Sequence, residues 1–138
     1  MSVEVREPVV TDAGNILDIR AVVFVQGGTV ECRLSLMYGP GWPDHTRIHL
    51  MMEDKQEAVH VYDLFNGIFK SKAHEMKGLR KHKRTGKLEV EWKIRKEEFR
   101  TLLEEIKDRF GDEWYNAFSL VSARIGSPLP GINSQRDT

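Results

Sequence analysis

The chain has one cysteine, no net charge and no long hydrophobic run in its 138 residues. A single thiol cannot form an internal disulfide, so a hydrophobic core must hold the fold, and a chain of this length can build one. The longest unbroken apolar run covers residues 21–25, whereas a membrane-spanning helix needs about 20 apolar residues. Because the first residues also lack the apolar segment of a signal peptide, we expect a cytoplasmic protein without membrane contact.

What the chain does contain is typical of a globular domain, with 40% apolar and 30% charged residues. Cys32 alternates with Val30 and Leu34 along one predicted strand face. This apolar setting favours a small buried side chain over a catalytic thiol, which needs exposure and nearby positive charge. We expect a single domain over residues 1–126 and an irregular or disordered tail over residues 127–138, which is rich in Pro, Gly and polar residues.

The first half of the sequence predicts strands, because β-branched residues are frequent and apolar and polar side chains alternate. Two such stretches, residues 16–26 and 30–38, are joined by a glycine pair that should form a hairpin turn. A third strand is expected at residues 47–53 and can join the same sheet. The segment before it, residues 39–46, contains two Pro and two Gly and therefore predicts a loop.

The N-terminal arm and the helical segments complete the predicted fold. Residues 3–10 are a candidate edge strand, in which Pro8 removes one backbone donor. Apolar residues at helical spacing predict helices at residues 54–69, 95–110 and 112–125. Without the arm, the order is β-β-β-α-β-β-α-α, which predicts an α+β fold with a mainly antiparallel sheet and helices packed on one face.

Two local features of these elements can be tested against a structure. Asp54 stands three residues before Glu57, which predicts a capping box at the start of the first helix. Residues 88–94 have the most regular strand pattern of the chain, so their apolar side chains should face the core and their polar ones the solvent. The apolar set is Leu88, Val90, Trp92 and Ile94, and the polar set is Glu89, Glu91 and Lys93.

The partner of this strand should be the segment just before it, joined by a turn at residues 85–86. That turn would place Arg80 opposite Glu91 and Leu79 opposite Trp92, which gives one charged pair and one apolar pair. The tip of the hairpin would then present several cations close together.

The strongest functional signal is a run of positive charge that leads into this hairpin. Residues 70–87 contain eight Lys or Arg and one acid, Glu75, although the whole chain is neutral. The eight are Lys70, Lys72, Lys77, Arg80, Lys81, Lys83, Arg84 and Lys87. Cations on a projecting β-ribbon can neutralise phosphates, and such a ribbon fits a DNA major groove or lies along an RNA backbone. The alternative is a solvated charged surface without a ligand.

The other candidate sites have weaker patterns. His45 and His49 have a spacing that suits metal ligands on a helix, but along a strand it separates the two rings by about 13 Å, so we expect neither a metal nor a cofactor. Trp42 is either a contact residue for a partner or an anchor that packs back on the core. The sequence indicates no catalytic residue, although a triad is a spatial arrangement that sequence spacing alone does not exclude.

Three functional hypotheses follow from these patterns. The first is a small nucleic-acid-binding or ribonucleoprotein-associated module that contacts the phosphates of DNA or RNA. The second is a protein-interaction or regulatory subunit that docks an acidic partner, with an exposed Trp42 or Trp114 as its hot spot. The third is a small enzyme with a site near His45 and His49, which has no further support because function must be argued from a site.

Overall fold

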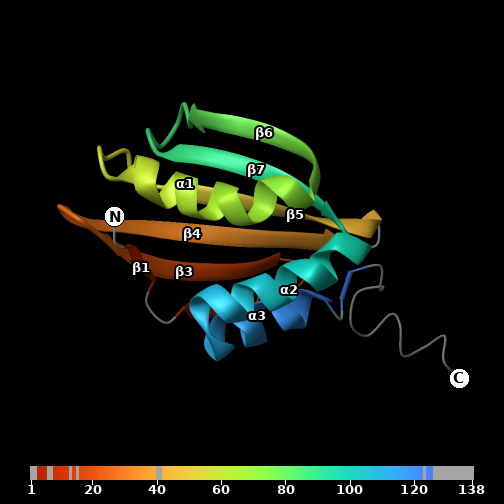
Figure 1. Ribbon diagram of the computed structural model, residues 1–138. Coiled ribbons are helices and arrows are strands. Elements are labelled where there is room, and N and C mark those ends of the chain that lie inside the picture. The colour runs from red at the N-terminus through yellow and green to blue at the C-terminus, as the bar shows by residue number, and fades with distance from the viewer. Residues whose placement is uncertain are drawn as a thin grey trace, which may run out of the picture.

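The computed structural model describes residues 3–5, 8–12, 14, 16–39, 42–122 and 124–125. Within these residues the chain forms one antiparallel sheet of seven strands, and three α-helices cover one of its faces (Figure 1). This arrangement confirms the predicted α+β fold. The predicted tail at residues 127–138 lies outside the described residues.

Along the described chain, five strands are followed by a helix, two more strands and two more helices. The strands are β1 (Val3–Val5), β2 (Val9–Asp12), β3 (Ile16–Val25), β4 (Gly28–Gly39), β5 (Trp42–Met52), β6 (Ala73–Lys81) and β7 (Leu88–Arg95). The helices are α1 (Ala58–Phe69), α2 (Lys96–Phe110) and α3 (Asp112–Ser122), with a short 3₁₀ turn η1 (Lys70–Lys72) after α1. The order across the sheet is β1-β3-β4-β5-β7-β6, and β2 pairs with β3 on the same side as β1.

The hairpin predicted in the first half is the longest pairing of the sheet. β3 and β4 run antiparallel from Ile16 opposite Met37 to Val25 opposite Gly28. Gly27 closes the turn at a φ of 102°, a conformation that residues with a Cβ rarely adopt. Alternate side chains of both strands therefore face the helices, and Cys32 is buried among them as predicted.

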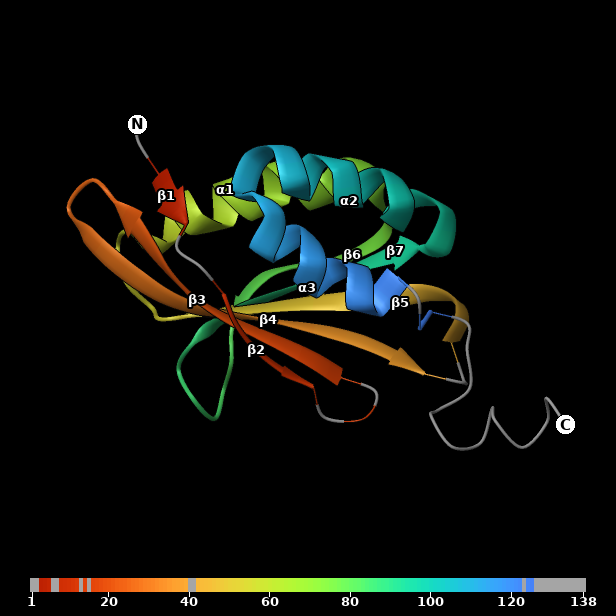
Figure 2. The ribbon, with the colours of Figure 1, turned by 90° about the horizontal axis from the view of Figure 1, so that it is seen from below.

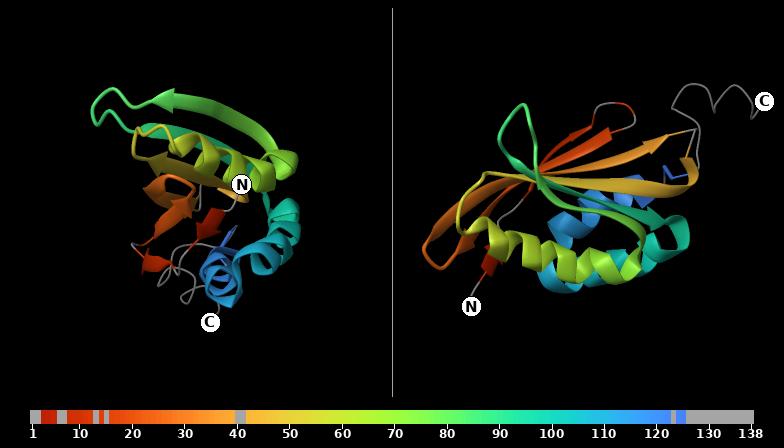
Figure 3. Two further views of the ribbon diagram at one scale, coloured as in Figure 1. Left: turned by 60° about the vertical axis from the view of Figure 1, so that its left-hand side comes forward. Right: turned by 90° about the horizontal axis from the view of Figure 1, so that it is seen from above.

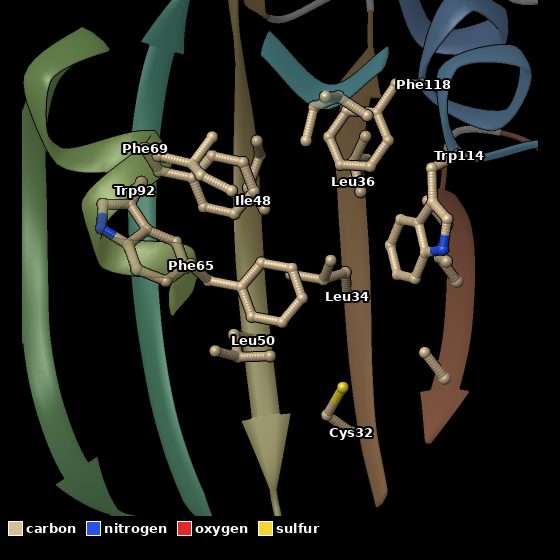
Figure 4. Close-up of a cluster of buried hydrophobic side chains, with 14 of the residues drawn as sticks. Cys32, Leu34, Leu36, Ile48, Leu50, Phe65, Phe69, Trp92, Trp114 and Phe118 are labelled. Carbon is tan, nitrogen blue, oxygen red and sulfur yellow. The ribbon is translucent and has the colours of Figure 1, made fainter. Parts of the chain in front are cut away.

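The hydrophobic core lies between the sheet and the three helices, where aromatic rings from separate elements meet (Figure 4). The rings of Phe69 on α1 and Trp92 on β7 are 4.9 Å apart between centroids, an edge-to-face contact that stabilises beyond simple burial. The indole of Trp92 donates a hydrogen bond to Asn66 Oδ1 at 3.1 Å. Val90, Trp92 and Ile94 are fully buried and Leu88 is partly buried against the core, which confirms the predicted core face of β7.

Two local predictions about the middle of the chain are wrong. β5 begins at Trp42, so most of the predicted loop belongs to a strand, and Thr46 pairs with Ile94 of β7. Pro43 is tolerated because it stands near the start of the strand, where one missing ladder donor costs little. The predicted capping box is absent from the described helix start, since α1 begins at Ala58 and its N-cap residue makes no side-chain cap hydrogen bond.

The predicted register of the β6–β7 hairpin is also wrong, by two residues at its tip. Arg80 lies opposite Glu89, and Met76 is the residue opposite Trp92. The backbone N–H of His82 donates to the carbonyl of Lys87 at 2.7 Å, so four residues form the loop where two were expected. The ladder is also irregular between residues 77 and 80, and such bulges shift the pairing that follows.

Candidate functional site on the open face of the sheet

The face of the sheet opposite the helices, called the open face below, carries the side chains that alternate with the core residues. The tip of the β6–β7 hairpin extends on this side, away from the helices, in Figure 2 and in both views of Figure 3. β2 lies on the same side, beneath β3 in Figure 2. The open face therefore has a raised strand at one margin and a projecting hairpin at the other.

The strand register aligns polar side chains into a row that crosses five strands. The row runs through Asp18, Ser35, His49, Glu91 and Lys77, on β3, β4, β5, β7 and β6. Ser35 donates its hydroxyl to Asp18 Oδ1 at 2.5 Å, so this hydroxyl is directed at a carboxylate and away from His49. A nucleophile needs its base within hydrogen-bond reach, and the row lacks that arrangement among the described side chains.

Glu89 is the centre of a buried ionic cluster next to this row. Its Oε1 accepts a hydrogen bond from Arg80 Nη2 at 2.6 Å, and His49 Nε2 lies 3.6 Å from the same oxygen. His82 Nε2 lies 3.8 Å from Oε2. The residue is only 7% exposed, as expected of a carboxylate surrounded by cations and imidazoles.

The burial of this cluster corrects the predicted solvent face of β7. Glu91 is 9% exposed, close to the value for Glu89, although both were expected to face water. β7 lies between β5 and β6, and the long side chains of those neighbours cover its polar side. Lys93 is half-buried and reaches Glu75 at 2.5 Å, and the ammonium group lowers the pKa of the Glu75 carboxyl.

The tip of the hairpin is an ordered turn held by hydrogen bonds within residues 82–87. The ring Nδ1 of His82 accepts the backbone N–H groups of Arg84 and Thr85 at 3.2 and 3.3 Å. The hydroxyl of Thr85 accepts the backbone N–H of Lys87 at 3.2 Å. Gly86 has a φ of 73°, which its missing Cβ permits. These contacts fix the backbone that displays the cations of the tip.

Half of the eight predicted cations are already paired with acids. Arg80 binds Glu89, as described above. The other three pairs, by the shortest distance between nitrogen and oxygen, are Lys72 with Glu105 at 2.9 Å, Lys77 with Glu91 at 4.0 Å and Lys81 with Asp54 at 2.9 Å. Each pair places a negative charge beside the cation, which reduces what the cation can offer to a phosphate.

The remaining four cations have no acidic partner among the described residues. Lys70 follows α1 and is separated from the hairpin tip by the nine residues of β6, about 30 Å of extended chain. Lys83, Arg84 and Lys87 are all exposed and lie within the tip itself. We call these three residues the tip cations.

The structure also bears on the other sites proposed from the sequence, which are the two tryptophans and the histidines of β5. The side chain of Trp42 lies outside the described part of the structure, although its backbone begins β5. Trp114 is 1% exposed, so the expectation that it is an exposed hot spot is wrong. His45 Nδ1 lies 2.9 Å from Asp44 Oδ1, which lowers the pKa of that carboxyl. Within the described residues no three His, Cys, Asp or Glu side chains are grouped to hold a metal ion.

The structure also contains a groove of about 760 Å³ on the open face, which the sequence patterns did not reveal. Its floor is formed by β3, β4 and β5, Val9 of β2 lines one side, and two residues of the hairpin tip line the other. The charged lining residues are Arg20, Glu31, Arg33 and Lys87, and the apolar ones on the open face include Val22, Phe24 and Met51. The nearest signal in the sequence is that residues 20, 22 and 24 alternate with core positions of β3.

Comparison with known proteins gives no relative from which a function could be inferred, so a functional conclusion must be based on the open face itself. No helix in the described residues is both long and apolar enough to cross a membrane. The chain matches no protein-family model, no curated protein and no solved structure.

Proposed function

We propose that this protein is a cytoplasmic nucleic-acid-binding module that contacts backbone phosphates through the tip cations Lys83, Arg84 and Lys87. The observation that carries the proposal is that these cations project on a hairpin tip and have no acidic partner among the described residues. Unpaired cations can replace the counterions of a nucleic acid, and release of those counterions drives binding. A cation that is already paired contributes less binding free energy, because it must first separate from its own carboxylate.

The hydrogen bonds that hold the turn in one conformation also support a role in binding phosphates. The hydrogen bonds from Arg84 and Thr85 to the His82 ring, and from Lys87 to Thr85, hold the backbone before any ligand arrives. A preorganised loop loses less conformational entropy on binding than a flexible one. A two-stranded ribbon also fits the width of a DNA major groove and can follow an RNA backbone.

The tip favours contact with phosphates over reading of bases. Its sequence from residue 82 to residue 87 is HKRTGK, which offers no Phe, Tyr or Trp for stacking on unpaired bases. We therefore propose binding that depends weakly on the nucleic-acid sequence. Lys77, Arg80 and Lys81 would be secondary contacts, because each is already paired with a carboxylate.

The test replaces all three tip cations by Ala and measures affinity for duplex DNA and structured RNA at several salt concentrations. The parent should bind at low salt, and the triple variant should bind more weakly to every sequence. The slope of log K against log salt should flatten by about 2 to 3, since each lost phosphate contact removes about 0.7 to 0.9. Fluorescence anisotropy of labelled oligonucleotides gives both quantities.

A charge-matched control separates this site from a general effect of net charge. Arg100, Lys107 and Arg109 are exposed cations of α2, on the helical side of the sheet. Their triple replacement by Ala should leave the affinity and the salt slope close to those of the parent. Absence of binding by the parent at low salt, or an equal loss in both triple variants, would refute the proposal. Binding of acidic proteins would then be the hypothesis to test.

A further inference from the structure

We propose that the groove on the open face binds a small amphipathic organic anion, with an apolar body and one carboxylate or phosphate head. This inference does not depend on nucleic-acid binding by the hairpin tip. The groove volume of about 760 Å³ lies within the range of about 300 to 1,000 Å³ that is usual for small-molecule sites. Its lining also combines apolar surface with a few charged groups, as such sites do.

Arg33, on the groove floor, is the main reason to infer an anionic ligand. Its side chain is half-buried, and it has no acidic partner among the described residues. Its Nη2 contacts the thioether sulfur of Met51 at 4.0 Å, and its Nε is shielded from solvent without a hydrogen-bond partner in the described structure. Charged groups that leave water are normally paired, as Arg80 is with Glu89 in the same cross-strand row.

A second cation strengthens the inference, because Arg20 lies directly opposite Arg33 in the register of β3 and β4. Like charges at opposite positions of a sheet destabilise it. Arg20 is exposed and also has no acidic partner in the described residues. Lys87 lines the same groove from the hairpin tip, and Glu31 is the acid in the lining. Three cations facing one acid make the groove complementary to an anion.

The rest of the floor specifies an apolar body for that anion. Val22 and Phe24 of β3 and Met51 of β5 are half-buried on the open face, where the helices do not cover them. Val9 of β2, which is 65% exposed, faces the same groove. A hydrocarbon or aromatic ligand would remove this surface from water. A free inorganic anion would use the guanidinium groups and leave the apolar part of the groove empty.

The probes for this site are an anilinonaphthalene sulfonate dye, whose fluorescence reports binding, and three competitors that share a ten-carbon chain. Decanoate carries a carboxylate, decyl phosphate carries a phosphate, and decanol carries no charge. Decanoate or decyl phosphate should displace the dye at a concentration at least tenfold lower than decanol. The stronger of the two anions identifies the preferred head group.

Variants of the two guanidinium residues test whether the groove is responsible. Arg33→Gln should weaken binding of the preferred anion by roughly ten- to hundredfold, as expected on loss of hydrogen bonds to a charged group, and should leave decanol unchanged. Its melting temperature should equal or exceed that of the parent, because an unpaired charge is removed. Arg20→Gln changes an exposed residue and should weaken the same anion by severalfold. Arg100→Gln, on α2, serves as the control and should change nothing.

Several results would overturn the inference. Equal displacement by decanol and the anions would mean that charge is not recognised, and unchanged anion affinity in both Arg20→Gln and Arg33→Gln would place the ligand elsewhere. Displacement of the dye by a single-stranded oligonucleotide, without displacement by either ten-carbon anion, would assign the groove to nucleic acid. The double replacement Lys83→Ala and Arg84→Ala should weaken nucleic-acid binding and leave decanoate binding intact, so failure of one proposal does not imply failure of the other.

Discussion

The Arg80–Glu89 ion pair connects β6 to β7, and its energy can be bracketed from its exposure. The two side chains approach to 2.6 Å, with 42% of the arginine and 9% of the carboxylate side chain exposed. A solvent-exposed pair contributes about 0.2 to 1 kcal/mol, whereas removal of one partner from a fully buried pair costs about 3 to 5 kcal/mol. Because one partner is half-exposed and the other buried, we predict a coupling energy of about 1 to 2 kcal/mol.

A double-mutant cycle with Arg80→Met and Glu89→Gln measures this coupling. Arg80→Met alone should lower the free energy of unfolding by about 2 kcal/mol, since Glu89 then keeps only the more distant His49 and His82. Urea unfolding can be followed by the fluorescence of the buried Trp92 and Trp114. A coupling below about 0.5 kcal/mol, which is the usual non-additivity of independent sites, would refute the interpretation.

A double-mutant cycle on Lys77 and Glu91 gives a second coupling energy to compare with that of Arg80 and Glu89. Their charged atoms are 4.0 Å apart and the lysine side chain is 60% exposed, so the coupling should not exceed about 1 kcal/mol. A larger coupling here than at Arg80 would show that exposure does not set the strength of these pairs.

Two further predictions concern the core. Val90→Asp should unfold the protein, because an unpaired carboxylate at a fully buried position costs several kcal/mol against a typical stability of about 5 to 15 kcal/mol; a thermal melt within a degree or two of the parent would contradict it. Burial raises the pKa of the Cys32 thiol from 9.0 to about 12, so its reaction with a thiol reagent near pH 8 should be about a thousandfold slower in the native protein than in denaturant, since the thiolate is the reactive form. Rapid labelling of the native protein would place this thiol at the surface.

The parts of the fold that sequence reasoning predicted well depend on local periodicity. Val90, Trp92 and Ile94 recur every second residue and are all buried, and the apolar stripe of α2 packs on the core as its spacing indicated. In both cases the repeat distance of the backbone decides which side chains share a face, so no knowledge of distant residues is needed.

The predictions that were wrong depend on partners far away in the sequence. Alternation showed that Glu89 and Glu91 share a face of β7, but their burial follows from side chains on β5 and β6 that sequence spacing does not reveal. The register at Arg80 follows from a turn of four residues, and the bulge between residues 77 and 80 shifts the pairing beyond it, at Met76, further. Neither feature is visible in the local alternation of side chains.

For the candidate site, too, local sequence predicted one part, and the rest depended on residues far away in the chain. The count of cations in residues 70–87 identified the hairpin as the candidate site. It did not identify which cations were neutralised, because Asp54 and Glu105 come from the β5–α1 connection and from α2. The groove is still less accessible to such reasoning, since it requires β2, three strands of the sheet and the hairpin tip to meet in space.

The strands at the two edges of the sheet have a consequence for behaviour at high protein concentration. Among the described residues, β6 pairs only with β7, and on the opposite margin β1 and β2 are short strands of three and four residues. The outer edge of such a strand can recruit a strand from another molecule, and growth of such contacts leads to aggregates. The irregular spacing of β6 opposes this recruitment by mismatch, and the exposed tip cations that follow β6 oppose it by repulsion between copies. The same cationic ribbon therefore helps to keep neighbouring molecules apart in solution.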